Sequence, residues 1–367
     1  MQASACFSSI SSPLLVMPVV VFVMAPLLLG LLSTTPSLAW AAPVSRTITV
    51  DCHGRGDVRT VRSASAVDSV PDGNRDWIKI HVMVGTYWEK VSIPKQKGYI
   101  LLEGDGSSTT DISFDAQAHA GIDDIMGRPN VTADEQSPTF QSATFTVLAD
   151  NLVARGIAFK NTYRAPDDQL SKENQAVAVL VGGDKSAFYA CEFHGFQDTL
   201  CDFQGRHYFR GCQVRGAVDF VFGFCQSIYE DCALVSDMPP GPQTGWVTAH
   251  ARVAAGSPGG LVFKGGAVQA AGAAQGQGQT YLGRAWNAFA AVVFYRTRMD
   301  GVVVPQGWQA WNAAGNVWSV TFAEVECTGP GSEMSRRVGW EKRLTEEEVR
   351  RFVDIRFIDD GWLSNQP

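Results

Sequence analysis

The sequence predicts an all-β solenoid, in which short strands wind into stacked coils. Short runs rich in Val, Ile and Phe recur along the chain between Gly, Asp and Asn residues, a pattern typical of strands joined by tight turns. A pattern of small residue, Cys, polar residue and apolar residue repeats at Cys191, Cys212 and Cys232. This period of about twenty residues, without helical periodicity between the copies, indicates the coils of a β-solenoid.

The composition agrees with this class. The chain has 367 residues, of which 36 are glycine and 17 are proline, as expected for many tight turns. Hydrophobic residues make up 45% and charged residues 18%, which excludes a wholly disordered protein. The formal net charge of −7 argues against a general nucleic-acid binder, which would need a basic surface.

The N-terminal residues 1–41 have the features of a secretory signal peptide. Residues 1–44 contain no basic or acidic side chain, and Leu14–Leu32 is almost wholly apolar. Ala39-Trp40-Ala41 supplies the small residues of a cleavage site. A retained signal anchor is the alternative, although two prolines interrupt the apolar run. We expect a secreted chain in which residues 42–367 form one domain, with no membrane span after cleavage.

Seven cysteines would remain after signal cleavage, so at least one thiol has no intramolecular disulfide partner. We predict that the repeated cysteines form an inward ladder of small apolar side chains, with a disulfide between neighbouring coils as the alternative. The sequence has no C-x-x-C pair and no cluster of Cys and His, which argues against a zinc site. Asn130-Val131-Thr132 is a glycosylation sequon.

The strand-like segments can be placed in order along the chain. They are Ile78–Val84, Tyr99–Glu103, Thr144–Leu148, Ile157–Phe159, Ala176–Val181, Val218–Phe222, Leu261–Lys264, Val292–Arg296 and Val317–Phe322. A short C-terminal helix is predicted after Thr345, because Thr345 and Glu348 match a capping box ahead of an apolar face. A shorter helix after Thr60 is also considered.

Two aspartates are the best candidates for chemistry. Asp198 and Asp219 each lie beside apolar and aromatic residues, and they are 21 residues apart, which is one coil of the solenoid. Equivalent positions on adjacent coils lie about 5 Å apart. Two carboxyl groups this close cannot both ionise easily, so one can serve as a nucleophile and the other as a general acid.

Two glutamines follow the same spacing. Gln175 and Gln197 are 22 residues apart, so their amides would lie beside the carboxyl pair and could donate to an oxyanion. The competing interpretation is that both aspartates only bind their own turns, as Asp often does beside Gly. A serine hydrolase is not supported, because the chain lacks a G-x-S-x-G elbow.

Five segments together make the sequence similar to a known family. They are Gly85–Glu89, Gln175–Val179, Gly195–Leu200, Asp219–Gly223 and Leu282–Trp286, and in order and spacing they resemble the signature segments of plant pectin methylesterases. The resemblance extends from about Thr47 to Leu363. It implies a right-handed, single-stranded parallel β-helix for residues 42–367, without the N-terminal inhibitor-like region that many relatives carry.

The resemblance also implies a role for each chemical residue. Asp219 would attack the methyl-ester carbonyl of a galacturonate unit in pectin (homogalacturonan), and Asp198 would be the general acid and then the base. Gln197 and Gln175 would donate to the oxyanion. Arg284 would pair with Asp219, keeping it ionised and oriented, because an adjacent guanidinium lowers the pKa of a carboxyl group.

Further positions are implied to bind the substrate. Trp286 would stack on a sugar ring, and Thr139 matches a position that contacts substrate. The chain departs from the family at Ala285, where Pro is usual, and at His250, where Gln is usual, so His250 could alter the cleft or its response to pH.

The implied enzyme needs no metal or other cofactor, acts on the cell wall after secretion, and is a candidate partner for a proteinaceous pectinesterase inhibitor. No nucleic acid is expected as a partner. The alternatives are a depolymerising pectin lyase or glycoside hydrolase, and a non-catalytic relative that only binds pectin in the wall.

Overall fold

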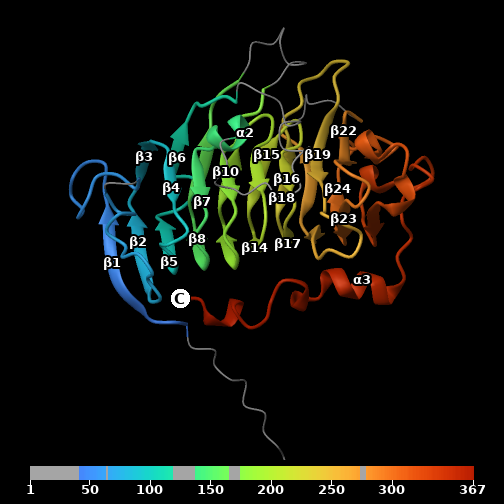
Figure 1. Cartoon of the computed structure of the whole chain (residues 1–367). Coiled ribbons are helices and arrows are strands. Elements are labelled where there is room, and N and C mark those ends of the chain that lie inside the picture. Colours follow the sequence, from blue (N-terminus) through green and yellow to red (C-terminus); the bar gives the residue numbers. More distant parts are fainter. Residues whose placement is uncertain (1–40, 63–64, 119–136, 165–173, 273–277) are drawn as a thin grey trace, which may run out of the picture. The chain divides into compact units, whose positions relative to one another are not determined.

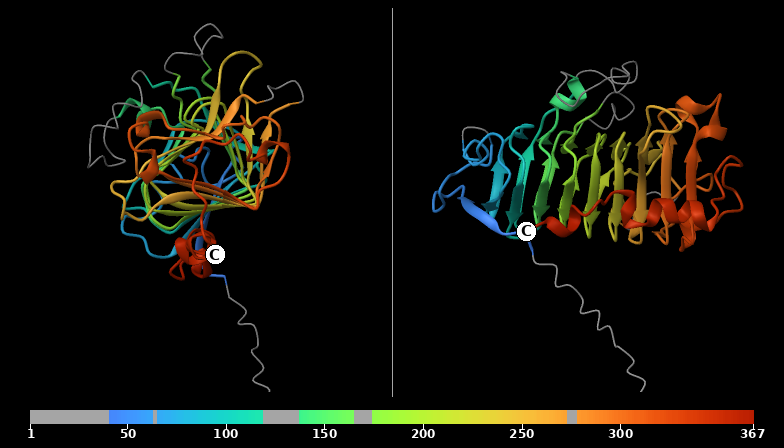
Figure 2. Two further views of the ribbon diagram at one scale, coloured as in Figure 1. Left: turned by 90° about the vertical axis from the view of Figure 1, so that its right-hand side faces the viewer. Right: turned by 60° about the horizontal axis from the view of Figure 1, so that its bottom comes forward.

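The computed structural model describes residues 41–62, 65–118, 137–164, 174–272 and 278–367 (Figure 1). Their strands form three sheets of ten, eight and eight strands, here called sheets A, B and C, and every strand pairing within them is parallel. Eight successive coils each contribute one strand to every sheet, and β1 and β26 extend sheet A at its two ends. The fold is therefore the right-handed, single-stranded parallel β-helix that was predicted. The left panel of Figure 2 looks along the stack of coils.

The strands are best given sheet by sheet. Sheet A contains β1 (Val44–Val50), β2 (Trp77–Val82), β5 (Ile100–Gly104), β8 (Leu152–Arg155), β11 (Ser186–Tyr189), β14 (Arg206–Arg210), β17 (Gln226–Glu230), β20 (Gly260–Lys264), β23 (Ala291–Tyr295) and β26 (Thr321–Val325). Sheet B contains β3 (Gly85–Trp88), β6 (Thr110–Phe114), β9 (Ala158–Asn161), β12 (Glu192–His194), β15 (Gln213–Gly216), β18 (Ala233–Ser236), β21 (Ala267–Ala270) and β24 (Arg298–Met299). Sheet C contains β4 (Val91–Ile93), β7 (Phe145–Val147), β10 (Val179–Val181), β13 (Leu200–Asp202), β16 (Val221–Gly223), β19 (Gly245–His250), β22 (Thr280–Ala285) and β25 (Trp308–Gln309).

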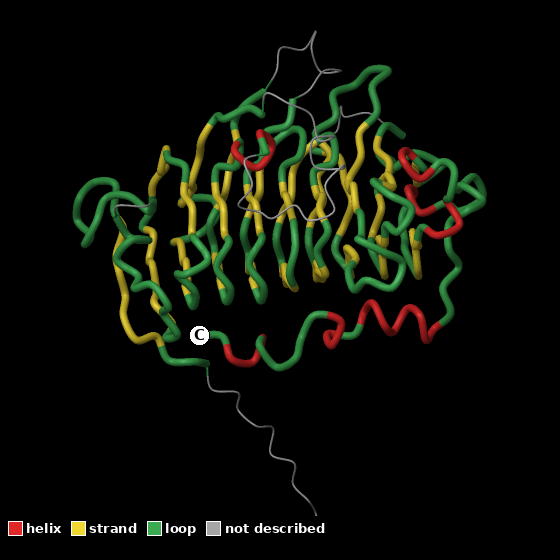
Figure 3. Tube along the Cα trace, in the orientation of Figure 1, coloured by secondary structure: helices red, strands yellow, loops and turns green. Residues whose placement is uncertain are grey.

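Helical segments are short and lie outside the sheets (Figure 3). They are α2 (Pro138–Gln141), α3 (Glu346–Val353) and the 3₁₀ turns η2 (Trp311–Ala313), η3 (Val317–Ser319), η4 (Pro330–Ser332), η5 (Ile355–Phe357) and η6 (Leu363–Asn365). The capping box of α3 is confirmed, because the Thr345 and Glu348 side chains each bind the other's backbone N–H. None of the helices in the described ranges is long and apolar enough to cross a membrane.

Several predicted strand boundaries are wrong for one reason, which is that turns interrupt the apolar runs. Val218–Phe222 contains only the start of β16, because Asp219 adopts a positive φ of 47° and closes a turn before the strand. Ile157 lies in the turn between β8 and β9. Residues 317–319 form η3, and β26 begins only at Thr321. The helix considered after Thr60 is a series of turns in the described residues there.

Side chains stacked one per coil fill the interior. On the inner face of sheet A the rings of Phe188, Phe209, Tyr229, Phe263 and Phe294 are register partners, with centroids 4.3–4.9 Å apart between successive rings. All five are at most 2% exposed. The rings therefore form one continuous stack through five consecutive coils.

The cysteine ladder is confirmed. Cys191, Cys212 and Cys232 are buried free thiols that lie at equivalent turns of three consecutive coils between sheets A and B. The next position is Gly266, whose added Cβ would lie 2.0 Å from the Cys232 carbonyl oxygen, so no larger residue fits there. The thiols therefore pack as small apolar groups, and the disulfide alternative is not formed in this structure.

The C-terminal segment returns along the outside of sheet A, as the red trace below the strands in Figure 1 shows. Gln226 donates to the Phe357 carbonyl, Tyr189 donates to Gln366 (2.6 Å), and Trp77 donates to the Asn365 carbonyl (3.1 Å). Ile358 and Trp362 pack on the outward apolar side chains of this sheet. The segment thus covers one face of the solenoid and leaves the outer face of sheet C for the site.

Candidate active site

The candidate residues lie in the turns that precede three neighbouring strands of sheet C, β10, β13 and β16. Gln175 bridges to Gln197, and Gln197 bridges to Val218, so these three positions form one row across the coils. Asp198 and Asp219 follow in the next row, one strand spacing apart, roughly 4.8 Å. The structure thus places the two aspartates and the two glutamines at adjacent backbone positions of neighbouring coils.

The backbone of both aspartates is unusual. Asp198 has a φ of 62° and Asp219 a φ of 47°, which places them in the left-handed region that Asp tolerates better than most residues. The two residues thus share the same unusual backbone region at successive coils. Strained backbone of this kind persists where the surrounding structure holds it, as at many functional sites.

The two carboxyl groups are fully buried but differ in their partners. Neither oxygen of Asp198 has a hydrogen-bond partner among the described residues, whereas Asp219 binds the guanidinium of Arg284. Burial and the neighbouring Asp219 carboxylate raise the pKa of Asp198 well above its usual range. Burial also raises the pKa of Asp219, but Arg284 offsets part of this effect. Asp219 is therefore the carboxyl group of the pair that ionises first, and Asp198 retains its proton.

Arg284 on β22 binds Asp219 through both of its oxygens. Its Nε donates to Oδ1 at 2.9 Å, and its Nη2 donates to Oδ2. The guanidinium carbon also lies 4.3 Å from the Trp246 ring centroid and 3.9 Å from that of Trp311. Two indoles therefore hold the planar group in the orientation that a bidentate bond requires. The sequence predicted the ion pair from the resemblance, but it did not assign this role to Trp246.

The expectation that Arg284 keeps Asp219 ionised stays a prediction. The guanidinium lowers the pKa of Asp219, as expected, while burial raises it. Arg284 thereby makes Asp219 the more acidic carboxyl group of the pair.

The glutamine amides are placed to donate. Gln197 accepts a hydrogen bond from the Asn174 backbone N–H at its Oε1 (3.3 Å), which fixes the amide so that Nε2 remains available as a donor. Gln175 is 3% exposed, and its Oε1 has no partner among the described residues. The row of amides thus lies directly beside the row of carboxyl groups.

Thr139 and Trp286 form the surroundings of this site rather than its open face. Thr139 lies on α2 and is buried, with no partner for its hydroxyl in the described part of the chain. Trp286 is 1% exposed, and its ring packs against Phe224 at 5.0 Å and Phe222 at 6.1 Å between centroids. Stacking on a sugar ring, as expected for Trp286, would first require this indole to be uncovered.

His250 does not act as the pH-sensitive group that was considered. It is fully buried at the end of β19, and its Nδ1 accepts the Ala291 backbone N–H at 2.9 Å. Burial and the nearby Arg252 lower its pKa to about 3, so the imidazole is neutral near neutral pH.

Other residues of the signature segments are structural. Tyr87 donates to the Val50 and Met83 carbonyls, and the Glu89 carboxylate accepts the backbone N–H groups of Val61 and Arg62. Their role is to fix the coil between β3 and β4.

Asp51, Cys52 and His53 form the one group in the described ranges that could hold a metal ion. This group was not predicted from the sequence. It lies at the end of β1, far along the stack of coils from β13 and β16, and Arg55 already binds the Asp51 carboxylate at 2.6 Å. Nothing connects this group to the aspartate pair.

Two expectations concern residues outside the described ranges. They are the signal peptide predicted over residues 1–41, of which residues 1–40 are not described, and the glycosylation sequon at Asn130.

Comparisons with known proteins agree on one family. The family described as Pectinesterase matches residues 47–361. Probable pectinesterase 29 from Arabidopsis thaliana is 40% identical over 325 residues, which is 87% of this chain and 89% of that protein. Putative pectinesterase 10, also from Arabidopsis thaliana, is 39% identical and covers 89% of each chain. The structure of pectin methylesterase from carrot superposes with a TM-score of 0.73 and 30% identity, covering 87% of this chain and 95% of that one. The chain therefore belongs to the pectinesterase family.

Proposed function

We propose that the chain hydrolyses the methyl esters of galacturonate residues in pectin, with Asp219 as the nucleophile and Asp198 as the general acid and base. The observation that carries this assignment is the pairing of two buried carboxyl groups in unlike environments. Asp219 is bound by a guanidinium, and Asp198 has no partner among the described residues. A carboxylate and a carboxylic acid side by side are what this reaction requires.

The first half-reaction transfers the acyl group to the enzyme. An Asp219 oxygen attacks the ester carbonyl carbon, and the carbonyl oxygen becomes an oxyanion that accepts hydrogen bonds from the Gln197 and Gln175 amides. The intermediate collapses by breaking the bond to the methoxy oxygen, which takes the proton of Asp198 and leaves as methanol. An acyl-enzyme anhydride on Asp219 and an ionised Asp198 remain.

The second half-reaction restores both groups. Asp198 takes a proton from a water molecule while the oxygen of that water attacks the carbonyl carbon of the galacturonyl group. The bond to Asp219 then breaks, which releases a free galacturonate carboxyl group and regenerates the Asp219 carboxylate beside Arg284. The pKa values raised by burial favour a protonated Asp198 at the start of each cycle.

The cellular setting is also proposed. We infer secretion to the cell wall from the charge-free apolar N-terminus, with pectin as the partner there. Regulation by a proteinaceous inhibitor remains a prediction, and its check is inhibition of methanol release by a purified inhibitor protein.

The experiment that tests the proposed function measures methanol release from highly methylated pectin together with the chain length of the polymer, without added calcium. Methanol with intact chains supports the esterase. Shortened chains would indicate a lyase or glycoside hydrolase instead. A folded protein that binds pectin but releases no methanol would be the non-catalytic wall-binding relative.

A further inference from the structure

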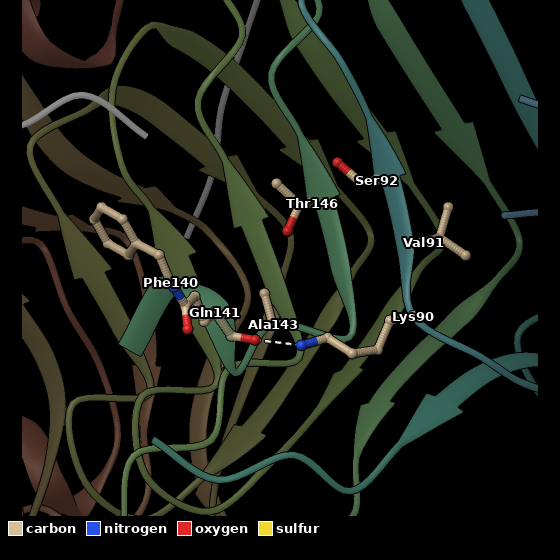
Figure 4. Close-up of a pocket in the computed structure, with 7 residues that line it drawn as sticks. All are labelled: Lys90, Val91, Ser92, Phe140, Gln141, Ala143 and Thr146. Carbon is tan, nitrogen blue, oxygen red and sulfur yellow. Dashed lines mark hydrogen bonds between the residues drawn. The ribbon is translucent and has the colours of Figure 1, made fainter. Parts of the chain in front are cut away.

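A hollow lies on sheet C away from the aspartates, between β4, β7 and α2 (Figure 4). Its volume is about 430 Å³, within the range of small-ligand sites. Ser92 and Thr146 are register partners on its floor, and each points outward while its neighbours in the strand are buried. Phe140 and Gln141 of α2 form one wall, and Lys90 lies at the rim.

The hollow lies on a register row of sheet C that also contains Arg284. The row runs from Ser92 through Thr146 and four further strands to Arg284 on β22. Four strand spacings separate β4 from β16, the strand that follows Asp219, which is roughly 19 Å. The side chains between Thr146 and Arg284 in this row are buried under Phe140 and Trp286. A polymer that reaches both the hollow and the aspartates must therefore pass over this cover rather than along the strands.

Lys90 is a cation without a carboxylate partner in the described part of the chain. Its Nζ donates to the Gln141 carbonyl, as the dashed line in Figure 4 shows, and lies 6.0 Å from the Phe114 ring centroid. Two of its three N–H groups thus remain for a ligand. An unpaired cation in a protein with a net charge of −7 is suited to an anionic ligand.

An exposed indole lies next to this cation. Trp88 is 56% exposed, and its ring lies 5.9 Å from that of Phe114, the same ring that Lys90 approaches. Glu89, between Trp88 and Lys90, is buried and binds the backbone N–H groups of Val61 and Arg62, at 2.9 and 3.0 Å respectively. The corner that presents the indole and the ammonium is therefore rigid, so binding there costs little ordering.

We propose that Trp88, Lys90 and the adjoining hollow bind a de-esterified galacturonate residue of the pectin chain. The apolar face of the sugar packs on the Trp88 indole, its carboxylate pairs with the Lys90 ammonium, and its hydroxyls reach Ser92 and Thr146. A methyl ester lacks the charge that pairs with Lys90. The site thus binds a de-esterified stretch of the pectin polymer while a methyl ester of the same polymer lies at Asp219. This inference rests on the proposed function for its choice of ligand.

The test measures binding without turnover. An unesterified oligogalacturonate is titrated calorimetrically into the full chain and into the Trp88→Ala and Lys90→Gln variants. Each variant should raise Kd about five- to tenfold, and Lys90→Arg should restore binding, because a cation–carboxylate pair and a sugar–aromatic contact are each worth about 1 kcal/mol. Trp318→Ala and Lys79→Gln are the matched controls, since Trp318 is 70% exposed on η3 and Lys79 pairs with Glu103 on sheet A. Both controls should bind as the unmodified chain does.

Two results would overturn the proposal. One is an unchanged Kd for both Trp88→Ala and Lys90→Gln. The other is an equal loss of affinity for polyglutamate, which would mean that Lys90 attracts any polyanion. Kinetics add a second readout, because the variants should raise KM on long, partly de-esterified pectin and leave kcat unchanged. A chain that binds as expected but releases no methanol would refute the proposed function and leave this site standing.

Discussion

Replacing Arg284 with lysine tests how the ion pair with Asp219 works. Lysine keeps the positive charge but cannot donate to both carboxylate oxygens from a planar group. The native contacts comprise the bond from Nε to Oδ1 at 2.9 Å, the bond from Nη2 to Oδ2, and the two indole faces of Trp246 and Trp311.

The expected loss follows from these contacts. Losing one charge-assisted hydrogen bond costs about 2 kcal/mol, and weakening the indole contacts costs about 1 kcal/mol. A total of about 3 kcal/mol corresponds to a fall in kcat/KM of about 100-fold if the contacts act in the transition state. The acid limb of the pH profile should also move to higher pH, because Arg284 opposes the effect of burial on the pKa of Asp219.

The assay is methanol release from methylated pectin as a function of pH. Arg206→Lys is the matched control, because Arg206 on sheet A also binds a carboxylate, that of Asp184, through two nitrogens, at 3.0 and 2.6 Å. Its third nitrogen binds Asp360. The control should retain its rate. An Arg284→Lys variant with full rate and an unshifted pH profile would refute the orienting role.

Three further predictions concern buried carboxyl groups. Asp219→Ala should abolish methanol release while circular dichroism and the melting temperature show a folded chain, and near-normal activity would disprove the nucleophile. Because burial raises the pKa of Asp198, its contribution to stability is complete below its unfolded pKa of about 4 and is lost as pH rises through the folded value. As pH rises from 4, the free energy of unfolding, measured by urea titration, should therefore fall less in Asp198→Asn than in the unmodified chain. An equal fall with pH in both proteins would contradict this. Burial and the nearby Glu324 raise the pKa of Glu341 to about 7, so its contribution to the free energy of unfolding falls between pH 4.5 and 7, by about 3 kcal/mol at most. Glu341→Gln should remove this fall in the same titration. A fall of unchanged size in the variant would contradict the raised pKa.

The regular coil explains which parts of the site the sequence could predict. Asp198 and Asp219 are one coil apart, as are Gln175 and Gln197, and consecutive coils of a solenoid place equal positions side by side. Spacing alone therefore predicted the juxtaposition. Arg284 reaches Asp219 across two coils of unequal length, so only the family resemblance connected them.

Side-chain environments were harder to predict than register. An aromatic residue on sheet C can face a ligand or complete the packing of a neighbouring loop, and the sequence pattern is the same for both. Trp286 is buried against Phe222 and Phe224, whereas Trp246 and Trp311 hold the guanidinium of Arg284. Strand ends were also misplaced, because a single residue with positive φ, such as Asp219, ends a strand without changing the apolar pattern.

The returning C-terminal segment has a consequence for how the solenoid unfolds. In a stack where each coil contacts only its neighbours, the end coils can fray without disturbing the middle. Here the segment that follows α3 bonds to Gln226, Tyr189, Arg155 and Trp77, so it joins coils from β2 to β17 that do not all contact one another directly. Its loosening would release several coils together and expose their apolar outer face. The C-terminal segment therefore makes the stack of coils unfold as one cooperative unit, because residues 365–367 bind coils toward the N-terminal end of the solenoid.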